Sequence, residues 1–343
     1  MVATSVYYTV EEVNDWVRTA NTKRVEVSEE MRGWRWYDYP LQPAYSQQLG
    51  VSDITSGFCD TQRYVYLKYV ERVWQKDNEE LQKGALLHEI HAKANEAAKR
   101  NILKTHWETG TITPEAFHQA YLQDKQKIIQ QAKAKYRLIP QSQLETAINT
   151  LWSRAAYNYT AALTRATTIS RYLNTPDPLI SLVAPITTEY HTLPPGTASP
   201  APVAPITTEY PIDGTKLGLT QAIRADGYIP PGIIIEIKTH PPLEANKYAL
   251  AGYALSYESQ HNTPINYGVF IHIEYNWQTA TLTTHPKLTP ITDELRQAFI
   301  EQRDQAQKII TEKIDPKLPP KCNPRCPYLT HCNPTTPNNY KTK

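Results

Sequence analysis

The chain has 343 residues, of which 40% are hydrophobic and 20% are charged, and these proportions exclude a wholly disordered protein. Its net charge of +2 excludes a generally basic surface, so any contact with nucleic acid must use a local patch. No stretch approaches the roughly 18 uncharged apolar residues that span a membrane, and the N-terminus shows no signal-peptide pattern. These features predict a cytoplasmic protein with no membrane partner.

The first hundred residues are predicted to be helical. Residues 1–58 carry many aromatic side chains and little periodicity, so short helices and loops are expected there. One helix is predicted over 59–74, and another begins near Gly84. On this second helix the apolar side chains form one stripe, while His88 and His91 lie on a different face. We expect His91 to stay on the surface.

Two further helices are predicted before the composition changes. Thr113 followed by Pro114 is typical of a helix N-terminus, and a long helix is expected over 142–173. Proline, threonine and small residues then dominate 174–204, and the octapeptide VAPITTEY occurs twice. Two copies are too few for a solenoid, so we interpret them as a hairpin-like insertion or a local duplication.

The last part of the chain is predicted to combine strands with helices. Asp213-Gly214 supplies a turn between two strand-like segments, and the apolar run 233–237 indicates a buried strand. A helix over 243–260 and a strand pair follow. A final amphipathic helix is expected to start at the N-cap Thr292. The predicted fold class is therefore α/β, with helical additions before the strands.

A carboxylate and an ammonium group stand at the end of the predicted strand 233–237. Side chains alternate along a strand, so Glu236 and Lys238 project from the same face. Asp226 ends the preceding segment, and the turn YIPPG can bring the two carboxylates together. Two adjacent carboxylates repel unless a cation lies between them, and oxygen ligands suit Mg²⁺ or Mn²⁺. The pattern predicts metal-dependent phosphodiester hydrolysis, although an isolated E-x-K is more often a surface ion pair.

His88 is the second element of the candidate metal site. The functional interpretation has its imidazole reach the same cation as Asp226 and Glu236. A lone histidine on a helix is more often packed or solvated than a ligand. His88 and His91 are three residues apart, so they do not form the H-E-x-x-H zinc motif.

Four cysteines form a second group, with one near the N-terminus and three clustered in the tail: Cys59, Cys322, Cys326 and Cys332. Four thiolates fit either a [4Fe–4S] cluster or a structural Zn²⁺, and the spacing favours neither. Disulfides are a third possibility. Each of these would clip the tail onto the N-terminal region and close a long loop.

Taken in order, G-A-L-L-H ending at His88, then Asp226, then E-I-K ending at Lys238 resemble the motifs of the RecB-like nucleases of the PD-(D/E)xK superfamily. With the split cysteine quartet, the chain is similar to the CRISPR-associated iron–sulphur RecB-like exonucleases, the Cas-four family. The likeness is strongest to the variant of archaeal subtype-A systems. CDTQRYVYLKYV, EYPIDGTKLGL and KYALAGYALSYE carry it further, over roughly residues 30–335.

This resemblance implies a PD-(D/E)xK core and a role for each site residue. His88, Asp226, Glu236 and the carbonyl of Ile237 would bind the Mg²⁺ or Mn²⁺, and Lys238 would act on the attacking water. The four cysteines would hold the cluster. Family members cut single-stranded DNA, commonly from the 5′ end, and help the CRISPR integrase to trim and orient new spacers. Single-stranded DNA and the integrase complex are therefore the expected partners.

The same resemblance implies a domain plan. Residues 1–83 would form an N-terminal region with the first cluster cysteine. The RecB-like nuclease domain would occupy 84–313, with a helical insertion over about 105–173 and a Pro-rich insertion over 174–204. The cysteine-rich tail, 314–343, would close the iron–sulphur site.

The chain departs from the family at one position of the helix that follows the active-site strands. The usual pattern there is Gln-x-x-x-Tyr, and the chain has Ala249 followed by Tyr253. The missing glutamine keeps a rival reading open, in which the protein is a non-catalytic DNA-binding partner of the integrase. A third reading is a restriction-type endonuclease with a zinc-binding tail.

Basic and aromatic residues near these motifs could line the approach of an anionic substrate. For each of them alone, core packing or a solvated position is the more frequent role. The candidates are Trp34, Trp36, Tyr37, Arg63, Tyr64, Lys68 and Arg224.

Overall fold

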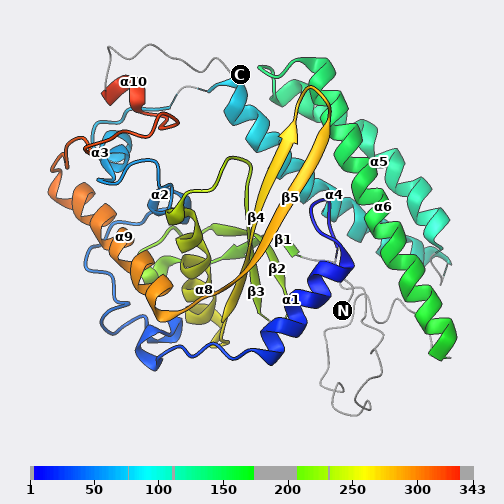
Figure 1. Cartoon of the computed structure of the whole chain (residues 1–343), viewed down its shortest axis with the longest axis horizontal. Helices are drawn as coiled ribbons and strands as arrows, with labels where there is room; N and C mark the ends of the chain where they lie inside the picture. The colour runs from blue at the N-terminus through cyan, green and yellow to red at the C-terminus, as the bar shows by residue number, and fades with distance from the viewer. Residues whose placement is uncertain (1–3, 76, 110–112, 174–206, 231, 333–343) are drawn as a thin grey trace.

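The computed structural model describes residues 4–75, 77–109, 113–173, 207–230 and 232–332. A sheet of five strands lies at its centre, with helices on both sides (Figure 1). The Pro-rich insertion and the first VAPITTEY copy lie outside the described residues. None of the helices within these ranges is long and apolar enough to cross a membrane.

The strands are arranged in the sheet in the order of the sequence. The first three pair antiparallel, β3 and β4 pair parallel, and β4 and β5 form an antiparallel hairpin. The parallel pair requires a crossover, which the helix α8 supplies. The strands are β1 (Thr207–Ile212), β2 (Ile223–Ile229), β3 (Ile233–Lys238), β4 (Tyr267–Asn276) and β5 (Thr281–Pro290).

Along the sequence, helices come before the first strand, between β3 and β4, and after the last strand, as predicted. Their bounds are α1 (Val10–Thr22), α2 (Val51–Ile54), α3 (Arg63–Tyr69), α4 (Glu79–Thr109), α5 (Pro114–Lys135), α6 (Gln141–Leu173), α8 (Tyr248–His261), α9 (Asp293–Glu312) and α10 (Leu329–Cys332).

The two predicted N-caps are confirmed. The side chain of Thr113 accepts a hydrogen bond from the backbone N–H of Ala116, and Thr292 does the same for Leu295. These bonds satisfy backbone donors that the first turn of a helix leaves unpaired. A third cap was not predicted: Thr9 and Glu12 form a capping box that starts α1, so this helix is longer than expected.

Two predicted helix bounds are wrong. Helix 59–74 is shorter, because Gln62 has a φ of 55° and ends a turn that begins at Cys59, so α3 starts only at Arg63. The next helix, α4, starts at Glu79 rather than near Gly84. Its first turn carries two glutamates, which suit the positive end of a helix dipole.

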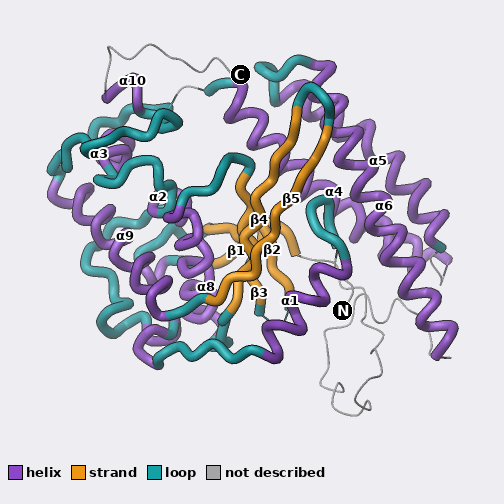
Figure 2. Tube along the Cα trace, viewed as in Figure 1, coloured by secondary structure: helices purple, strands orange, loops and turns teal. Residues whose placement is uncertain are grey.

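Strand β3 is buried on both faces, as its apolar run predicts. Ile233, Ile235 and Ile237 pack into a core formed with α1, α4, α5 and α6. Ile234 points the other way, into a core formed with α2, α3, α8 and α9. The molecule therefore has three layers, and Figure 2 shows the sheet between the two sets of helices. Glu236 and Lys238 share the face of Ile234, toward α8.

A buried charge cluster is centred on Glu258 of α8. The carboxylate of Glu258 has no exposed surface and accepts hydrogen bonds from the guanidinium groups of Arg32 and Arg296. It also accepts bonds from the backbone N–H groups of Gly33 and Ile265. Gly33 permits this close approach, because a Cβ there would lie 2.0 Å from a backbone oxygen of α8. This network holds the N-terminal segment against α8 and α9.

Candidate functional site

The fold brings His88 of α4 to Asp226 of β2, as expected. The His88 Nδ1 lies 3.1 Å from Asp226 Oδ1. The other carboxylate oxygen of Asp226 accepts a 2.6 Å hydrogen bond from the backbone N–H of Ile237 on β3. Asp226 is therefore fixed between a helix and the strand that carries Glu236 and Lys238. The side chains of His88 and Asp226 are 31% and 16% exposed, so a small ligand can reach them.

Glu236 and Lys238 lie together on the next strand. The Lys238 ammonium donates a hydrogen bond to Glu236 Oε1, and the side chains are 19% and 5% exposed respectively. Strand pairing extends from Gly227 opposite Ile235, which places Asp226 and Glu236 at neighbouring positions across β2 and β3. The predicted turn thus brings the two carboxylates side by side. Among the described residues, however, His88, Asp226 and Glu236 do not offer three ligand atoms within 4.8 Å of one another.

The two carboxylates differ in their electrostatics. Burial disfavours the charge on Asp226, but His88 and Lys238 outweigh it and lower the pKa of this carboxyl. Burial and repulsion from Asp226 both raise the pKa of Glu236. Together they outweigh the attraction of Lys238, which lowers it. The centre therefore holds one stable carboxylate and one whose negative charge is poorly compensated. An added cation would complete that compensation.

Lys238 and His88 are the basic groups of the centre. Burial opposes their charged forms, but Glu236 and Asp226 outweigh it and raise the pKa of Lys238. Burial likewise works against the imidazolium of His88, and Asp226 reverses this, so its pKa is raised. The two acids that these groups contact therefore raise both pKa values against the effect of burial.

Tyr253 of α8 faces the same centre. It is buried, and its pKa is raised first by burial and then by the charges of Glu236 and Asp226. Ala249, one turn earlier on α8, is also buried. The position where the family usually has glutamine therefore lies inside the protein and offers no polar group.

Sequence reasoning missed Glu209. In the register of β1 and β2, Glu209 stands opposite Asp226, at a position where the ladder pairing is interrupted. Its φ is 50°, a left-handed conformation that is costly for a glutamate. Burial and the Asp226 charge raise its pKa, while His88 acts in the opposite direction. Glu209 lies in the strand before the one that carries Asp226, and this position is the sequence feature that could have identified it.

The expectation that His91 lies on the surface is wrong. Its side chain is buried, and its ring stacks on Tyr7 with a centroid separation of 5.1 Å. Its pKa falls to about 4, chiefly because burial disfavours the charged form. The segment before α1 covers this face of α4, and helical periodicity does not reveal such a cover.

The Cys326 thiol lies close enough to Cys59, Cys322 and Cys332 for their charges to act on it. All lie among the described residues and are free thiols. Burial raises the pKa of Cys326 to about 11, and the other three cysteines contribute to the rise. No three of the four sulfurs lie within 4.8 Å of one another, although these residues are all described. A tetrahedral Zn²⁺ with Zn–S bonds of about 2.3 Å requires sulfurs about 3.8 Å apart, so the observed spacing is wider than a zinc site.

Three polar contacts hold the tail near these cysteines. Arg63 pairs with Asp315 at 2.8 Å and donates a hydrogen bond to the sulfur of Cys332. Thr61 donates to the carbonyl of Lys317. The tail is thus held against α3 by the protein itself.

The candidate DNA-contacting residues are mostly engaged elsewhere. Arg63 pairs with Asp315 of the tail, Tyr64 is buried in the core, and Lys68 pairs with Asp53. Tyr37 is 49% exposed and lies edge-on to Trp36. Of these, Tyr37 is available to a ligand and the other three are structural.

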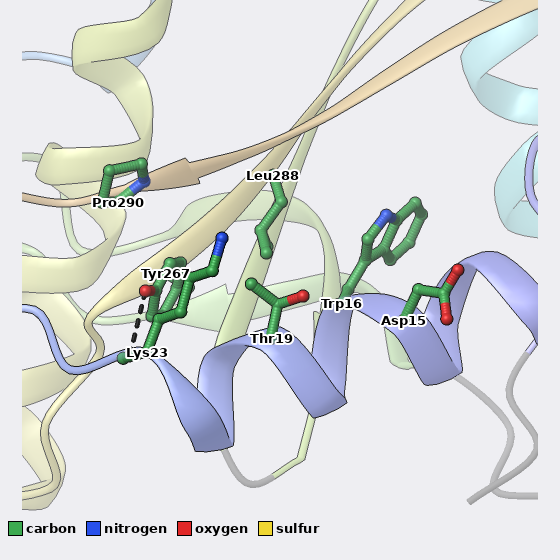
Figure 3. A pocket seen from close by; sticks show the side chains of 7 residues that line it. All are labelled: Asp15, Trp16, Thr19, Lys23, Tyr267, Leu288 and Pro290. Carbon is green, nitrogen blue, oxygen red and sulfur yellow. Dashed lines mark hydrogen bonds between the residues drawn. The ribbon is translucent and has the colours of Figure 1, made fainter.

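A pocket of about 410 Å³ lies away from this centre, between α1 and the far ends of β4 and β5. Figure 3 shows Tyr267 donating a hydrogen bond to the carbonyl of Lys23 at its edge. Asp15 and Lys23 are the charged groups that line it. The pocket lacks the gathered acids and imidazole of the His88 centre, so it offers no comparable chemistry.

The chain is similar over most of its length to CRISPR-associated exonucleases. It is 30% identical over 312 residues to "CRISPR-associated exonuclease Csa1" of Saccharolobus solfataricus, covering 90% of this chain and 93% of that protein. It is 28% identical over 307 residues to the protein of that name from Thermoproteus tenax, covering 90% and 92%. The family profile described as "CRISPR-associated exonuclease Csa1" matches residues 6–196 and 192–335. The chain belongs to the Csa1 family, which confirms the resemblance to this group of nucleases.

Proposed function

We propose that the protein is a metal-dependent, single-stranded DNA exonuclease with a PD-(D/E)xK core. It works from the 5′ end, carries a [4Fe–4S] cluster and acts with the CRISPR integrase complex in spacer acquisition. One observation carries the proposal. His88 contacts Asp226, which in turn binds the backbone of the strand that presents Glu236 and Lys238.

The donor set fits a hard divalent cation. Asp226 and Glu236 offer carboxylate oxygens and His88 an imidazole nitrogen, and the carbonyl of Ile237 completes the proposed ligands. The raised pKa of Glu236 supports this assignment, because a buried carboxylate beside Asp226 lacks full compensation. When bound, Mg²⁺ or Mn²⁺ would supply a more acidic water and neutralise charge on the scissile phosphate.

The protein's own groups then position the reaction. The N–H of Ile237 fixes Asp226, so this carboxylate needs no reorganisation to receive a ligand. Lys238 is kept charged by its acidic neighbours and is partly exposed, so its ammonium can orient a water and stabilise charge on the phosphate. Tyr253 closes the apolar side of the centre from α8.

The cluster assignment rests on the thiols. The charges of the other three cysteines act on Cys326, yet no three of the four sulfurs lie within 4.8 Å of one another, and this supports a group larger than a tetrahedral zinc ion. Cys59, Cys322, Cys326 and Cys332 would hold it. Its first effect would be structural, because it would link the tail to the segment before α3.

The activity test uses anaerobically purified full-length protein with Mn²⁺ and single-stranded DNA labelled at either end. We expect degradation from the 5′ end, lost on addition of a chelator and in Lys238→Ala and Asp226→Ala. Lys308→Ala, on the exposed face of α9, is the matched control and should cleave normally. Parental rates in the two site variants would overturn the nuclease assignment and favour the non-catalytic integrase partner.

The cluster has a separate test. The protein should be brown and contain iron and sulfide, and Cys326→Ser should abolish both. A colourless protein with bound zinc would contradict the cluster while leaving the nuclease centre unaffected. Integrase pull-downs with the Lys238→Ala protein test the partner independently of cleavage.

A further inference from the structure

A second group of metal-ligating side chains lies on the hairpin of β4 and β5. His272 and Glu274 are two residues apart on β4, so their side chains share one face. His285 of β5 is the cross-strand partner of His272. The ligand atoms of the three side chains all lie within 4.8 Å of one another, the one such group among the described residues.

The distances within this group match metal ligands better than hydrogen bonds. Glu274 Oε1 lies 3.6 Å from His272 Nδ1 and 3.7 Å from His285 Nε2. Both distances exceed that of an ordinary hydrogen bond, which is about 2.7–3.2 Å. Ligands of a tetrahedral Zn²⁺ at about 2.0–2.1 Å are separated by about 3.4 Å. The convergence therefore has the spacing of a coordination shell.

The surroundings also suit a cation. The two rings are nearly parallel, with centroids 5.7 Å apart, so a nitrogen of each can face the same point. Burial lowers the pKa of His272, while the carboxylate of Glu274 opposes this fall and His285 adds to it. Glu274 and His285 are 61% and 54% exposed, so a metal ion can enter from solvent.

We propose that His272, Glu274 and His285 form a binding site for a divalent transition-metal ion of the Zn²⁺ type. Two imidazoles and one carboxylate favour such an ion over Mg²⁺, which prefers oxygen ligands. Three protein ligands leave a position open to water or to a ligand. His272 pairs with Lys238 in the sheet register, so this open position lies on the same face as the nuclease centre and next to it.

The site also links two strands. A bound ion would join β4 to β5 at the level where β3 ends, since Lys238 is the last residue of β3 and stands beside His272. Beyond that point the hairpin continues without β3 for support. The ion would therefore stabilise the hairpin against separation of its strands, in proportion to the ion's occupancy.

The test is the binding of Zn²⁺ and Co²⁺ to the full-length protein with its cysteine site loaded, followed by calorimetry and absorption. We expect one equivalent in addition to any ion at the nuclease centre, and the affinity of this equivalent should fall at least about tenfold in His285→Ala and Glu274→Gln. His118→Ala, a half-buried histidine of α5, should bind normally, and so should Asp226→Asn. Bound Co²⁺ should show weak visible bands without the intense charge-transfer band of thiolate ligands.

Two outcomes would overturn the site. One is that His285→Ala binds Zn²⁺ as tightly as the parent protein. The other is that the equivalent disappears in Asp226→Asn, which would assign it to the nuclease centre. His285 is exposed, so its variant should keep the fold, and equal melting temperatures without metal verify this. Zn²⁺ should raise the melting temperature of the parent protein and not that of His285→Ala. This result is independent of DNA cleavage.

Discussion

Two buried glutamates show how a fold treats a carboxylate that supports structure and one that is available for chemistry. Glu258 on α8 accepts five hydrogen bonds, three of them from Arg32 and Arg296, and has no exposed surface. Within the described part of the chain, Glu236 on β3 accepts one bond, from Lys238, and its pKa is raised by burial and by Asp226. The first carboxylate has every acceptor position used, and the second retains capacity for a further partner. Both carboxylates are buried, but neighbouring groups neutralise the charge of Glu258 more fully than that of Glu236.

The largest expected effect comes from breaking the satisfied cluster. Glu258→Gln leaves two buried guanidinium groups without their counter-charge, and we expect it to lower the free energy of unfolding by about 3–5 kcal/mol. Chemical denaturation measures this. Glu244→Gln, in an exposed pair with Lys247, is the control and should cost less than about 1 kcal/mol. Equal costs for the two variants would contradict the structural role of Glu258.

Glu236→Gln should have a small effect on stability and a large effect on DNA cleavage. The neutral amide removes a charge that burial and Asp226 already disfavour, so the metal-free protein should lose much less stability than in Glu258→Gln. Cleavage of single-stranded DNA should fall on the order of 100-fold, because a proposed metal ligand is lost. Parallel unfolding and cleavage assays separate the two effects. A variant as unstable as Glu258→Gln would remove the distinction between the two glutamates.

The two histidines of α4 also differ in how their surroundings treat charge. Asp226 raises the pKa of His88, whereas burial lowers the pKa of His91 to about 4 from 6.5. The unfolded chain therefore binds more protons at His91 between these values, so its contribution to stability is complete above about pH 6.5 and is lost as the pH falls toward about 4. Between about pH 7 and pH 4.5, the parent should lose about 1–3 kcal/mol more than His91→Gln. Identical pH profiles would mean that His91 is not buried as a neutral ring.

The smallest effect is expected at Glu209, which is only partly buried. If its carboxylate adds to the field at Asp226, Glu209→Gln should weaken Mn²⁺ binding up to about tenfold, with little change in the melting temperature. Titration calorimetry measures the affinity. Thr208→Ala, at the preceding position of β1, is the control and should bind Mn²⁺ normally. An unchanged affinity in Glu209→Gln would restrict the centre to His88, Asp226 and Glu236.

Local patterns predicted much of this fold. The apolar run of β3 and the caps Thr113 and Thr292 could be predicted from the sequence, because each depends on neighbours a few residues away. The approach of Asp226 to Glu236 was also readable, because one short turn joins their strands. The ligand roles of these residues stay predictions.

The features that could not be predicted depend on distant partners. His91 is covered by the segment before α1, and Glu258 is neutralised by arginines from two other parts of the chain. The backbone conformation of Glu209 has no local cause in the sequence, since glutamate rarely adopts a positive φ. Likewise, the metal-ligand spacing of His272 and His285 follows from the register of a hairpin, which loop length alone does not fix.

The contact between Arg32 and Glu258 spans 226 positions of the chain, and this has a consequence for biosynthesis. When Arg32 emerges from the ribosome, its counter-ion has not yet been translated, and neither have Arg296 and the rest of α9. The N-terminal segment therefore cannot reach its final packing during synthesis, as domains that fold early do. It must remain hydrated until most of the polypeptide has been made. Nascent chains that stall before Glu258 would expose an unneutralised arginine and an incomplete sheet, which makes them natural clients for chaperones and proteases.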